Sequence, residues 1–271
     1  MAARPLALIT GASAGIGAEF ARQMAAGGYD LALSARRRER LDSLAERLRT
    51  EHGCECLVIP ADLAEPGAPQ AICEAVAEQG RTIDVLVNNA GYAIAGVYHQ
   101  TEWDDQARFL QVMVTAVAEL SHRVLPGMRN SGNGGIINVA SLAGIVPGSS
   151  GHTLYAAVKS FMISFSESLA MENAQRGVCI QALCPGFTYS EFHDVVGTRD
   201  IVSKMPDYMW MQAEEVVRIS LARFGKPGAP VMLVPGRFNR FLATLSRKLP
   251  YRAAFALVKQ RSGNFRRQET D

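Results

Sequence analysis

Short apolar runs alternate with longer amphipathic stretches along most of the 271-residue chain. This alternation is typical of parallel β-α-β units, because strands covered on both faces by crossover helices read as continuous apolar runs. The pattern predicts seven strands, near residues 5–10, 30–35, 55–60, 83–88, 134–140, 178–184 and 231–235. It predicts six helices between them, near residues 15–27, 38–52, 67–80, 102–129, 153–176 and 212–224. We therefore expect one doubly wound parallel sheet that binds ligands beyond the carboxyl ends of its strands.

The composition is that of a globular protein without a bias toward nucleic acid. Hydrophobic residues make up 48% of the chain and charged residues 20%, which argues against disorder, and the formal net charge is only +2. The cysteines are Cys54, Cys56, Cys73, Cys179 and Cys184. Because their spacing matches neither a disulfide framework nor a zinc site, we expect reduced thiols, no metal and a cytoplasmic location. The first apolar run is too short for a signal-peptide core or a membrane span.

A glycine-rich segment, Thr10-Gly-Ala-Ser-Ala-Gly-Ile-Gly17, follows the first predicted strand. Glycines allow a tight turn and close approach to a pyrophosphate, while the N-terminus of the next helix supplies free N–H groups. The spacing alone is a moderate signal, since glycine turns also follow strands for steric reasons. The dinucleotide contacts expected here come from Gly11, Ser13, Ala14, Gly15, Ile16 and Gly17.

The second predicted strand ends without an acidic residue and continues into Arg36, Arg37 and Arg38. A carboxylate at that position would accept hydrogen bonds from the ribose hydroxyls, whereas an arginine suits a 2′-phosphate. The alternative is a solvated basic helix start, which we expect to describe Arg37 and Arg38. With Arg36 assigned to the phosphate, NADP(H) is the predicted cofactor and NAD(H) the alternative.

The third and fourth strands carry further candidate cofactor contacts at their ends. Asp62 and Leu63 follow the third strand, where a short acid can hold an adenine amine, although Asp62 can equally cap the next helix. The fourth strand ends in four residues, Asn88-Asn-Ala-Gly91, and small residues there let a flat ring or ribose lie against the backbone. We expect Asn88 to join neighbouring strands. The cofactor contacts expected from this segment are Asn89, Ala90 and Gly91.

Ser141, Tyr155 and Lys159 are the predicted catalytic residues. Tyr155 and Lys159 are four residues apart in a predicted helix and therefore share a face, so the ammonium group can lie beside the phenol. A nearby positive charge stabilises the phenolate and lowers a tyrosine pKa from about 10. We expect Tyr155 to be the general acid or base and Ser141, after the fifth strand, to hold the substrate oxygen. The Tyr-x-x-x-Lys pattern alone is weak, but its combination with the glycine turn and the serine is specific.

The segment after the sixth strand is expected to close over the ligands. Pro185, Gly186 and Thr188 turn the chain across the presumed nicotinamide, and their backbone can bond its carboxamide. Residues 186–211 interrupt the strand and helix pattern, and we interpret them as a substrate lid, with an ordinary long loop as the alternative. The substrate contacts expected, besides Ser141, are Tyr92, His152, Tyr189 and Phe192.

Taken together, these motifs resemble the short-chain dehydrogenase/reductase family. The shared motifs are Thr10-Gly-x-x-x-Gly-x-Gly17, Asn88-Asn-Ala-Gly91, Ser141, Tyr155-x-x-x-Lys159 and Pro185-Gly186. The resemblance covers about residues 5–235. It implies a Rossmann-type α/β fold with helices on both faces of the sheet, an NAD(P)(H) cofactor and chemistry on CH–OH donors or carbonyls. It also implies that Lys159 bonds the nicotinamide ribose and that the helices near 102–129 and 153–176 form homodimers or homotetramers.

Two positions depart from the family pattern. Met113 stands where the family usually carries an asparagine that supports a water-mediated proton path to the lysine, and methionine cannot hydrogen-bond in that way. Either Met113 is only a core residue, or the proton takes another route and turnover is slow. Ala14 stands where NADP-preferring members often carry a basic residue or a hydroxyl, for which Ser13 can compensate.

The C-terminal segment is basic, with nine Lys or Arg residues from Val231 onward against Glu269 and Asp271. From Phe238 the apolar residues recur at helical spacing with cations between them, and Pro250 separates this helix from a second one over Tyr251 to Lys259. Such a segment suits an anionic membrane surface or a partner subunit, but equally a helix packed on its own body. We expect residues 1–236 to form the dinucleotide-binding domain and residues 237–271 to be its extension.

The function predicted from these residues is NADP(H)-dependent hydride transfer between nicotinamide and a carbonyl or alcohol. Apolar residues near the expected mouth suggest a hydrophobic substrate. A catalytically weak NADP(H)-binding sensor or scaffold is the alternative, because Met113 makes slow turnover conceivable. The third hypothesis is a peripheral membrane protein that depends on the C-terminal segment.

Overall fold

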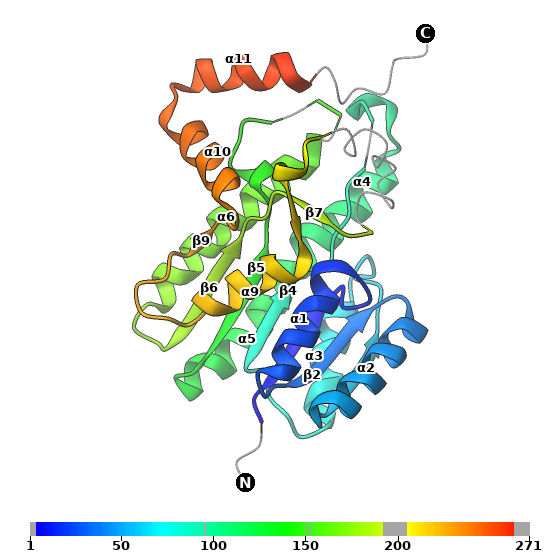
Figure 1. Cartoon of the computed structure of the whole chain (residues 1–271). Coiled ribbons are helices and arrows are strands. Elements are labelled where there is room, and N and C mark those ends of the chain that lie inside the picture. Colours follow the sequence, from blue (N-terminus) through cyan, green and yellow to red (C-terminus); the bar gives the residue numbers. More distant parts are fainter. Residues whose placement is uncertain (1–3, 95, 149, 152, 192–204, 263–271) are drawn as a thin grey trace.

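The computed structural model describes residues 4–94, 96–148, 150–151, 153–191 and 205–262. Its centre is a seven-stranded, all-parallel sheet with the order β3-β2-β1-β4-β5-β6-β9 (Figure 1). The strands are β1 (Leu6–Thr10), β2 (Asp30–Ala35), β3 (Cys56–Pro60), β4 (Val85–Asn88), β5 (Gly134–Val139), β6 (Val178–Leu183) and β9 (Met232–Leu233). The strand order reverses between β1 and β4, and ligands bind beyond the carboxyl ends of strands at such a point. This is the doubly wound, Rossmann-type sheet that the sequence pattern predicts.

Helices cover both faces of the sheet and bury its strands. One face packs against α1 (Gly15–Ala26), α2 (Arg38–His52) and α9 (Ala213–Arg223). The other packs against α3 (Ala68–Glu78), α5 (Ala116–Ser131) and α6 (Thr153–Asn173). Two hydrophobic cores result, one on each side, and all five residues of β1 are buried between them. Continuous apolar strands are the sequence signature of this three-layer packing.

The helix expected over residues 102–129 is interrupted in the structure. It consists of α4 (Trp103–Leu110), a π-helical turn η2 (Gln111–Thr115) and α5. Met113 lies in the π turn and is completely buried in the core of that face. A π turn inserts one residue into the helical register, which a 3.6-residue periodicity does not reveal.

The loop expected over residues 186–211 contains regular structure at both ends. Its first part forms β7 (Phe187–Tyr189) and its last part forms β8 (Trp210–Gln212), which pair as a small parallel sheet. The ring of Trp210 stacks on Tyr189 at 4.7 Å and packs against Phe187 at 5.3 Å. Three short 3-10 turns complete the irregular segments: η1 (Tyr98–Gln100), η3 (Leu142–Gly144) and η4 (Asp207–Met209).

The chain ends in two helices at the same end of the molecule as the carboxyl ends of the strands (Figure 1). These are α10 (Arg237–Lys248) and α11 (Tyr251–Ser262). Leu249 and Pro250 separate them, since proline cannot continue a helix. Both helices match the periodicity of the sequence. The assignment of residues 237–271 as an extension of one domain stays a prediction.

Candidate active site

The glycine turn between β1 and α1 makes a cradle that side chains would fill. Gly11 and Gly15 have φ angles of +66° and +54°, which L side chains rarely adopt. A Cβ on Gly11 would come within 2.8 Å of the Ala90 Cα, and one on Gly17 would overlap the Gly11 carbonyl oxygen and the Asn89 amide. The backbone of the turn therefore lies directly against the end of β4.

Hydrogen bonds hold this turn at the end of β4. Asn89 donates its side-chain amide to the Thr10 carbonyl at 2.9 Å and to the Gly11 carbonyl at 3.3 Å. The Thr10 hydroxyl accepts the backbone N–H groups of Asn89 and Ala90 at 3.0 and 3.1 Å. The side chain of Asn89, expected to contact a cofactor, thus positions the turn, and Thr10 is a supporting residue that the sequence analysis left unassigned.

The residues present fit a dinucleotide pyrophosphate. Within this described segment, the first turn of α1 carries no acidic residue, and Ala14 before it provides no side-chain cap. The first N–H groups and the positive end of the helix dipole are therefore available to an anion. Ser13 and Ile16 are part of the same partly exposed turn.

Arginines follow the end of β2, and one of them reaches the glycine turn. Arg37, which the sequence analysis treated as solvated, donates to the Ser13 hydroxyl at 3.1 Å and pairs with Glu191 at 3.1 Å. Arg40 also pairs with Glu191, at 2.7 Å, and the two arginines lower the pKa of that carboxyl. Arg36 is exposed. Arg37 was missed because its partner Glu191 is 154 residues away in the chain.

Asp62 is held by protein groups at the end of β3. Its carboxylate accepts the backbone N–H of Ala64 at 3.0 Å and pairs with Arg108 of α4 at 3.4 Å. It therefore caps a turn before α3 rather than the helix itself, whose N-cap is Gly67. The neighbouring Leu63 is buried in the core, so only its backbone is available to a ligand.

Asn88 joins strands, as expected. Its amide donates to Asn138 at 2.8 Å and to Ser121 at 3.2 Å, and Asn138 donates to Ser166 of α6 at 2.9 Å. All four side chains are buried. The network connects β4, β5, α5 and α6 below the site, and the buried side-chain oxygen of Asn88 has no hydrogen-bond partner among the described residues.

Ser141, Tyr155 and Lys159 meet at the end of β5. Ser141 has an extended backbone and is the N-cap of η3, where its hydroxyl accepts the backbone N–H of Ala143 at 3.1 Å. The hydroxyl groups of Ser141 and Tyr155 are hydrogen-bonded to each other. The ammonium nitrogen of Lys159 lies 5.6 Å from the centroid of the Tyr155 ring. Gly144 makes this arrangement fit, because a Cβ there would come within 2.6 Å of the Lys159 carbonyl oxygen.

Burial decides the protonation of this cluster. Desolvation raises the pKa of Tyr155 to about 12, against the lowering effect of the Ser141 hydrogen bond. Desolvation lowers the pKa of Lys159 to about 7. Lys159 donates to the Val139 carbonyl at 2.6 Å. The tyrosine pKa is therefore shifted opposite to the direction expected from the sequence, because desolvation of the half-buried phenol outweighs the lowering effect of the Ser141 hydrogen bond.

Cys184 is a neighbour of this cluster that the sequence analysis did not assign to the site. The residue after β6 is fully buried, and burial raises the pKa of its thiol to about 12 while the charge of Lys159 acts to lower it. Both Cys184 and Tyr155 are therefore uncharged at neutral pH. Lys159 is the group of the three that titrates in that range.

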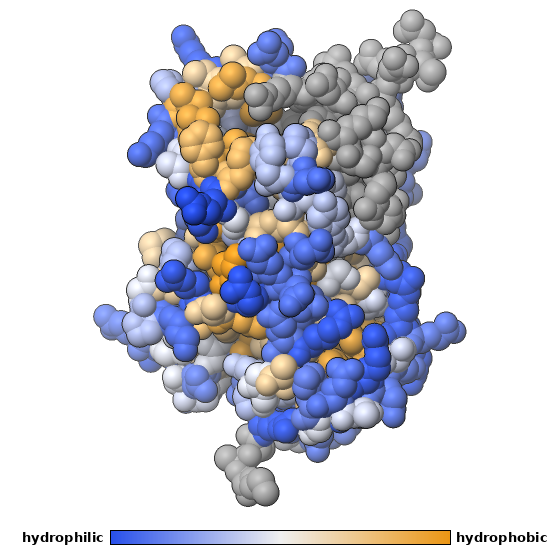
Figure 2. All heavy atoms as spheres, in the orientation of Figure 1, coloured by the Kyte–Doolittle hydropathy of each residue, from blue (hydrophilic) through white to orange (hydrophobic). Residues whose placement is uncertain are grey.

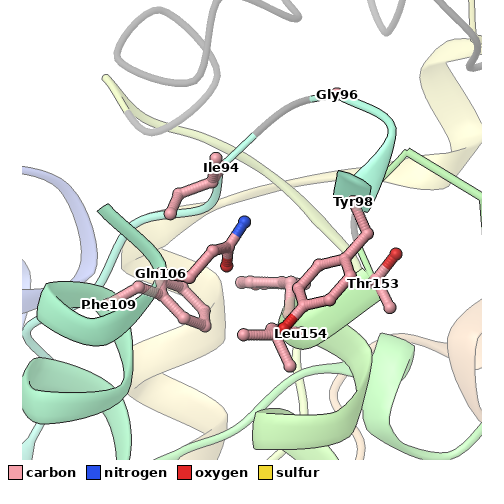
Figure 3. A pocket seen from close by; sticks show the side chains of 8 residues that line it. Ile94, Gly96, Tyr98, Gln106, Phe109, Thr153 and Leu154 are labelled. Atoms are coloured by element: carbon pink, nitrogen blue, oxygen red, sulfur yellow. The ribbon is translucent and has the colours of Figure 1, made fainter. Parts of the chain in front are cut away.

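A small cavity opens beside Tyr155 (Figure 3). Gln106 and Phe109 of α4 form one side of it and Tyr98, Thr153 and Leu154 the other. The lining is completed by Ile94, Gly96 and Tyr155. Of the substrate residues expected from the sequence, Tyr92 and Tyr189 do not line this cavity. Tyr92 instead packs edge-on against Phe109, and Tyr189 stacks on Trp210, while His152 and Phe192 lie outside the described residues.

The turn after β6 contacts both η3 and α10. The Pro185 carbonyl accepts the N–H of Leu142 at 2.9 Å, and Thr188, which is buried, donates its hydroxyl to the Gly186 carbonyl at 3.2 Å. A Cβ on Gly186 would meet the Asn239 side chain of α10 at 2.5 Å. Asn239 was not predicted from the sequence, because only the packing of α10 brings it to this turn.

These elements can be compared with known proteins. A model of the short chain dehydrogenase family matches residues 5–200. This chain is a member of that family. It is accordingly an NAD(P)-dependent oxidoreductase, as the glycine turn and the residues at the end of β5 lead one to expect.

The dehydrogenase has curated and structural relatives over most of its length. It is 32% identical over 224 residues to the 3-oxoacyl-acyl-carrier-protein reductase FabG of Staphylococcus aureus, covering 81% of this chain and 85% of the relative. A short-chain dehydrogenase from Sphingobium yanoikuyae in complex with NADPH is 33% identical, with a TM-score of 0.78, covering 91% and 96% of the two chains. The bulky-bulky ketone specific alcohol dehydrogenase from Comamonas testosteroni is 29% identical, with a TM-score of 0.73, covering 91% and 95%.

Met113 marks where this dehydrogenase departs from the family pattern. Its side chain packs on the turn after β4, since a Cβ on Gly91 would lie 2.8 Å from the Met113 sulfur. Gly91 is therefore needed for packing against Met113 as well as for any cofactor contact. The methionine is completely buried in the core, where it offers at most a weak sulfur acceptor to a proton path.

No group of three or more His, Cys, Asp or Glu side chains in the described part of the dehydrogenase is arranged to hold a metal ion. No helix within it is long and apolar enough to cross a membrane.

Proposed function

We propose that this dehydrogenase reduces the carbonyl group of a hydrophobic ketone or aldehyde with NADPH, or oxidises the corresponding alcohol. The observation that carries the proposal is the hydrogen bond between the Ser141 and Tyr155 hydroxyls, next to a buried Lys159 and at the carboxyl edge of the sheet. A substrate oxygen that accepts from both hydroxyls would be polarised by two donors.

The roles of the residues follow from their protonation. The nicotinamide supplies a hydride to the carbonyl carbon when bound, or accepts one from the alcohol. Tyr155 donates its phenol proton to the developing alkoxide, and Ser141 holds the same oxygen. The high pKa of Tyr155, about 12, keeps the phenol protonated at neutral pH, which suits proton donation and hence the reductive direction. Lys159 contributes positive charge beside the ring as phenolate forms.

The hydrophobic substrate is proposed from the lining beside Tyr155. Ile94 and Leu154 are half-buried apolar residues of this lining and Phe109 is an almost fully buried one, while Gln106 is a buried polar group that donates to Thr101 at 2.8 Å. The alcohol dehydrogenase relative described as specific for bulky-bulky ketones supports the same substrate class.

NADP(H) is the proposed cofactor, with NAD(H) as the alternative. Arg36 and Arg37 follow the end of β2, and Arg37 already contacts Ser13 in the glycine turn. Two structural relatives bound to NADPH or NADP support the same choice. Arg36→Ala should raise the KM for NADPH about tenfold, the loss of one charge-assisted contact, and leave the KM for NADH unchanged. Arg38→Ala is the matched control, and equal effects on both cofactors would contradict the assignment.

The decisive experiment for activity is a screen of bulky ketones, aldehydes and secondary alcohols with NADPH and NADP⁺, followed by absorbance. Tyr155→Phe should abolish turnover while NADPH still binds, whereas Tyr29→Phe, a tyrosine far from the site, should leave turnover intact. Retained turnover in Tyr155→Phe would refute the assigned role.

A catalytically weak NADP(H)-binding sensor or scaffold is the second candidate, favoured by the buried Met113. It predicts tight NADPH binding with no turnover of any carbonyl in the screen. Met113→Asn should then increase turnover if the missing asparagine limits the proton path. Unchanged turnover and solvent isotope effects in this variant would leave Met113 as a core residue.

Self-association is proposed from the family, as a homodimer or homotetramer formed through α4, α5 and α6. The mass of the protein in solution, measured by light scattering, tests this directly. A monomer at micromolar concentration would contradict it.

A further inference from the structure

The two C-terminal helices carry an unusual amount of exposed apolar surface. Ten large hydrophobic side chains in the described part of the chain are exposed, and half of them lie on α10 or α11. They are Phe241, Leu245, Tyr251, Phe255 and Leu257. Phe241 and Tyr251 are 61% and 72% exposed. Figure 2 shows this hydrophobic surface in orange over α10 and α11, bordered by hydrophilic residues.

The same helices are strongly cationic. Residues 237–259 contain six Lys or Arg residues and no Asp or Glu. Arg237, Arg240, Arg247 and Lys248 form no ion pair with any acidic residue of the described part of the chain. The positive charge of α10 is thus not neutralised within the described structure.

A groove of about 860 Å³ lies between α10 and α9, beside the edge strand β9. Its lining includes five cations and no acidic residue: Arg218, Arg223, Arg240, Arg247 and Lys248. Apart from Thr244 the rest of the lining is apolar and includes Ile219, Met232 and Val234. A groove of this composition is complementary to an anionic group attached to a hydrophobic one.

The helix α10 presents these two features side by side. Its buried side is fixed to the domain through Asn239 and Ala243, each 4% exposed. Residues three and four apart on a helix are neighbours on its surface. Phe241 and Leu245 therefore form one outward row, which lies next to the row of Arg240 and Lys248 at the groove.

The charge pattern decides between a second copy of the chain and a lipid surface. In a two-fold dimer the same patch meets itself, so two-fold contact through this surface would bring the five groove cations against five identical ones. An anionic lipid surface neutralises the cations with phosphate groups and accepts the exposed aromatic and aliphatic side chains into its interfacial layer.

We propose that α10, α11 and the cationic groove beside them dock this protein on an anionic lipid surface. The groove cations bind lipid phosphates, and the outward row of Phe241 and Leu245, with Tyr251 and Phe255 of α11, inserts between the headgroups. The proposal depends on the surface and not on the reaction, so it stands or falls independently of the proposed function.

The test is sedimentation of the full-length protein with phosphatidylcholine vesicles, with and without phosphatidylglycerol. We expect binding to the anionic vesicles, weakened by salt, and little binding to the zwitterionic ones. Each arginine near such a surface contributes about fivefold in binding, so Arg240→Gln with Arg247→Gln should weaken binding roughly 25-fold. Phe241→Ser with Phe255→Ser should weaken it as well, by removing inserted surface.

Matched controls are Arg47→Gln on α2 and Met171→Ser on α6, which change an exposed cation and an exposed apolar residue elsewhere. Unchanged thermal unfolding and NADPH binding show that the variants are folded. The proposal is overturned if the wild type does not bind anionic vesicles, or if the groove variant binds as well as Arg47→Gln. It is also overturned if Phe241→Ser with Phe255→Ser changes only the mass in solution, which would identify a second copy as the occupant.

Discussion

The buried ammonium group of Lys159 should make the stability of the protein depend on pH in an unusual direction. Only 5% of the residue is exposed, and desolvation lowers its pKa from 10.5 to about 7. The unfolded chain keeps this proton up to high pH, whereas the folded chain loses it near neutrality. Between the two pKa values the unfolded chain binds more protons, so the free energy of unfolding rises with pH.

The size of this effect follows from the two pKa values. Each pKa unit corresponds to about 1.4 kcal/mol, and the linkage relation gives a rise of about 2–3 kcal/mol between about pH 6 and about pH 9. In the folded chain Tyr155 and Cys184 stay protonated over that range, because their pKa values are raised to about 12. The Cys184 thiol loses its proton near pH 9 only in the unfolded chain, so it opposes the rise at the upper end of the range. Lys159 is the group of this cluster that makes the stability rise with pH.

The assay compares the wild type with Lys159→Met by urea unfolding across that pH range. Methionine retains the unbranched apolar stem and removes the charge, so other pH-dependent groups cancel in the difference. We expect the stability of the wild type to rise by about 2–3 kcal/mol relative to the variant, with the variant the more stable one at low pH. Parallel pH profiles for the two proteins would show that Lys159 keeps an ordinary pKa, and the argument from burial would fail.

Three further predictions concern the cofactor site and its supports. Gly17→Ala should weaken NADPH binding and lower the free energy of unfolding by about 1–3 kcal/mol, because its Cβ would overlap Gly11 and Asn89. Cofactor titration measures the affinity, and thermal unfolding measures the stability. An affinity equal to that of the wild type would contradict the close approach of the turn to Asn89. Glu191→Gln should strengthen NADPH binding severalfold without changing NADH binding, since it removes the ion pairs that hold Arg37 and Arg40. The free energy of unfolding should change by less than about 1 kcal/mol. A fluorescence titration with each cofactor measures the affinities, and Glu65→Gln is the control. Asn239→Ala should lower the free energy of unfolding by about 1–2 kcal/mol and raise the KM for NADPH. The reason is that the Asn239 amide donates to the Pro235 carbonyl at 3.0 Å and its side chain packs on Gly186. An unchanged KM would show that α10 does not support the turn at Gly186.

Local patterns in the sequence were sufficient for the strands of the main sheet and for the residues of the family motifs. The runs near 30–35 and 178–184 match β2 and β6 to within one residue, because a strand buried on both faces reads as a nearly continuous apolar run. Tyr155 and Lys159 share a face of α6 through their four-residue spacing alone. The membership of the short-chain dehydrogenase family follows from such motifs, while a cytoplasmic location and the division at residue 236 stay predictions.

Tertiary structure decided what depends on residues far apart in the chain. The contact of Arg37 with Ser13 and Glu191, the neighbourhood of Cys184 and Lys159, and the lining of the cavity by Tyr98 have no signature in local spacing. The π turn around Met113 and the β7–β8 pair are likewise set by packing against other elements. The protonation of Tyr155 shows the reason most clearly. A neighbouring charge is visible in the sequence, but desolvation sums over every atom that packs around the phenol, and only the folded chain brings those atoms together.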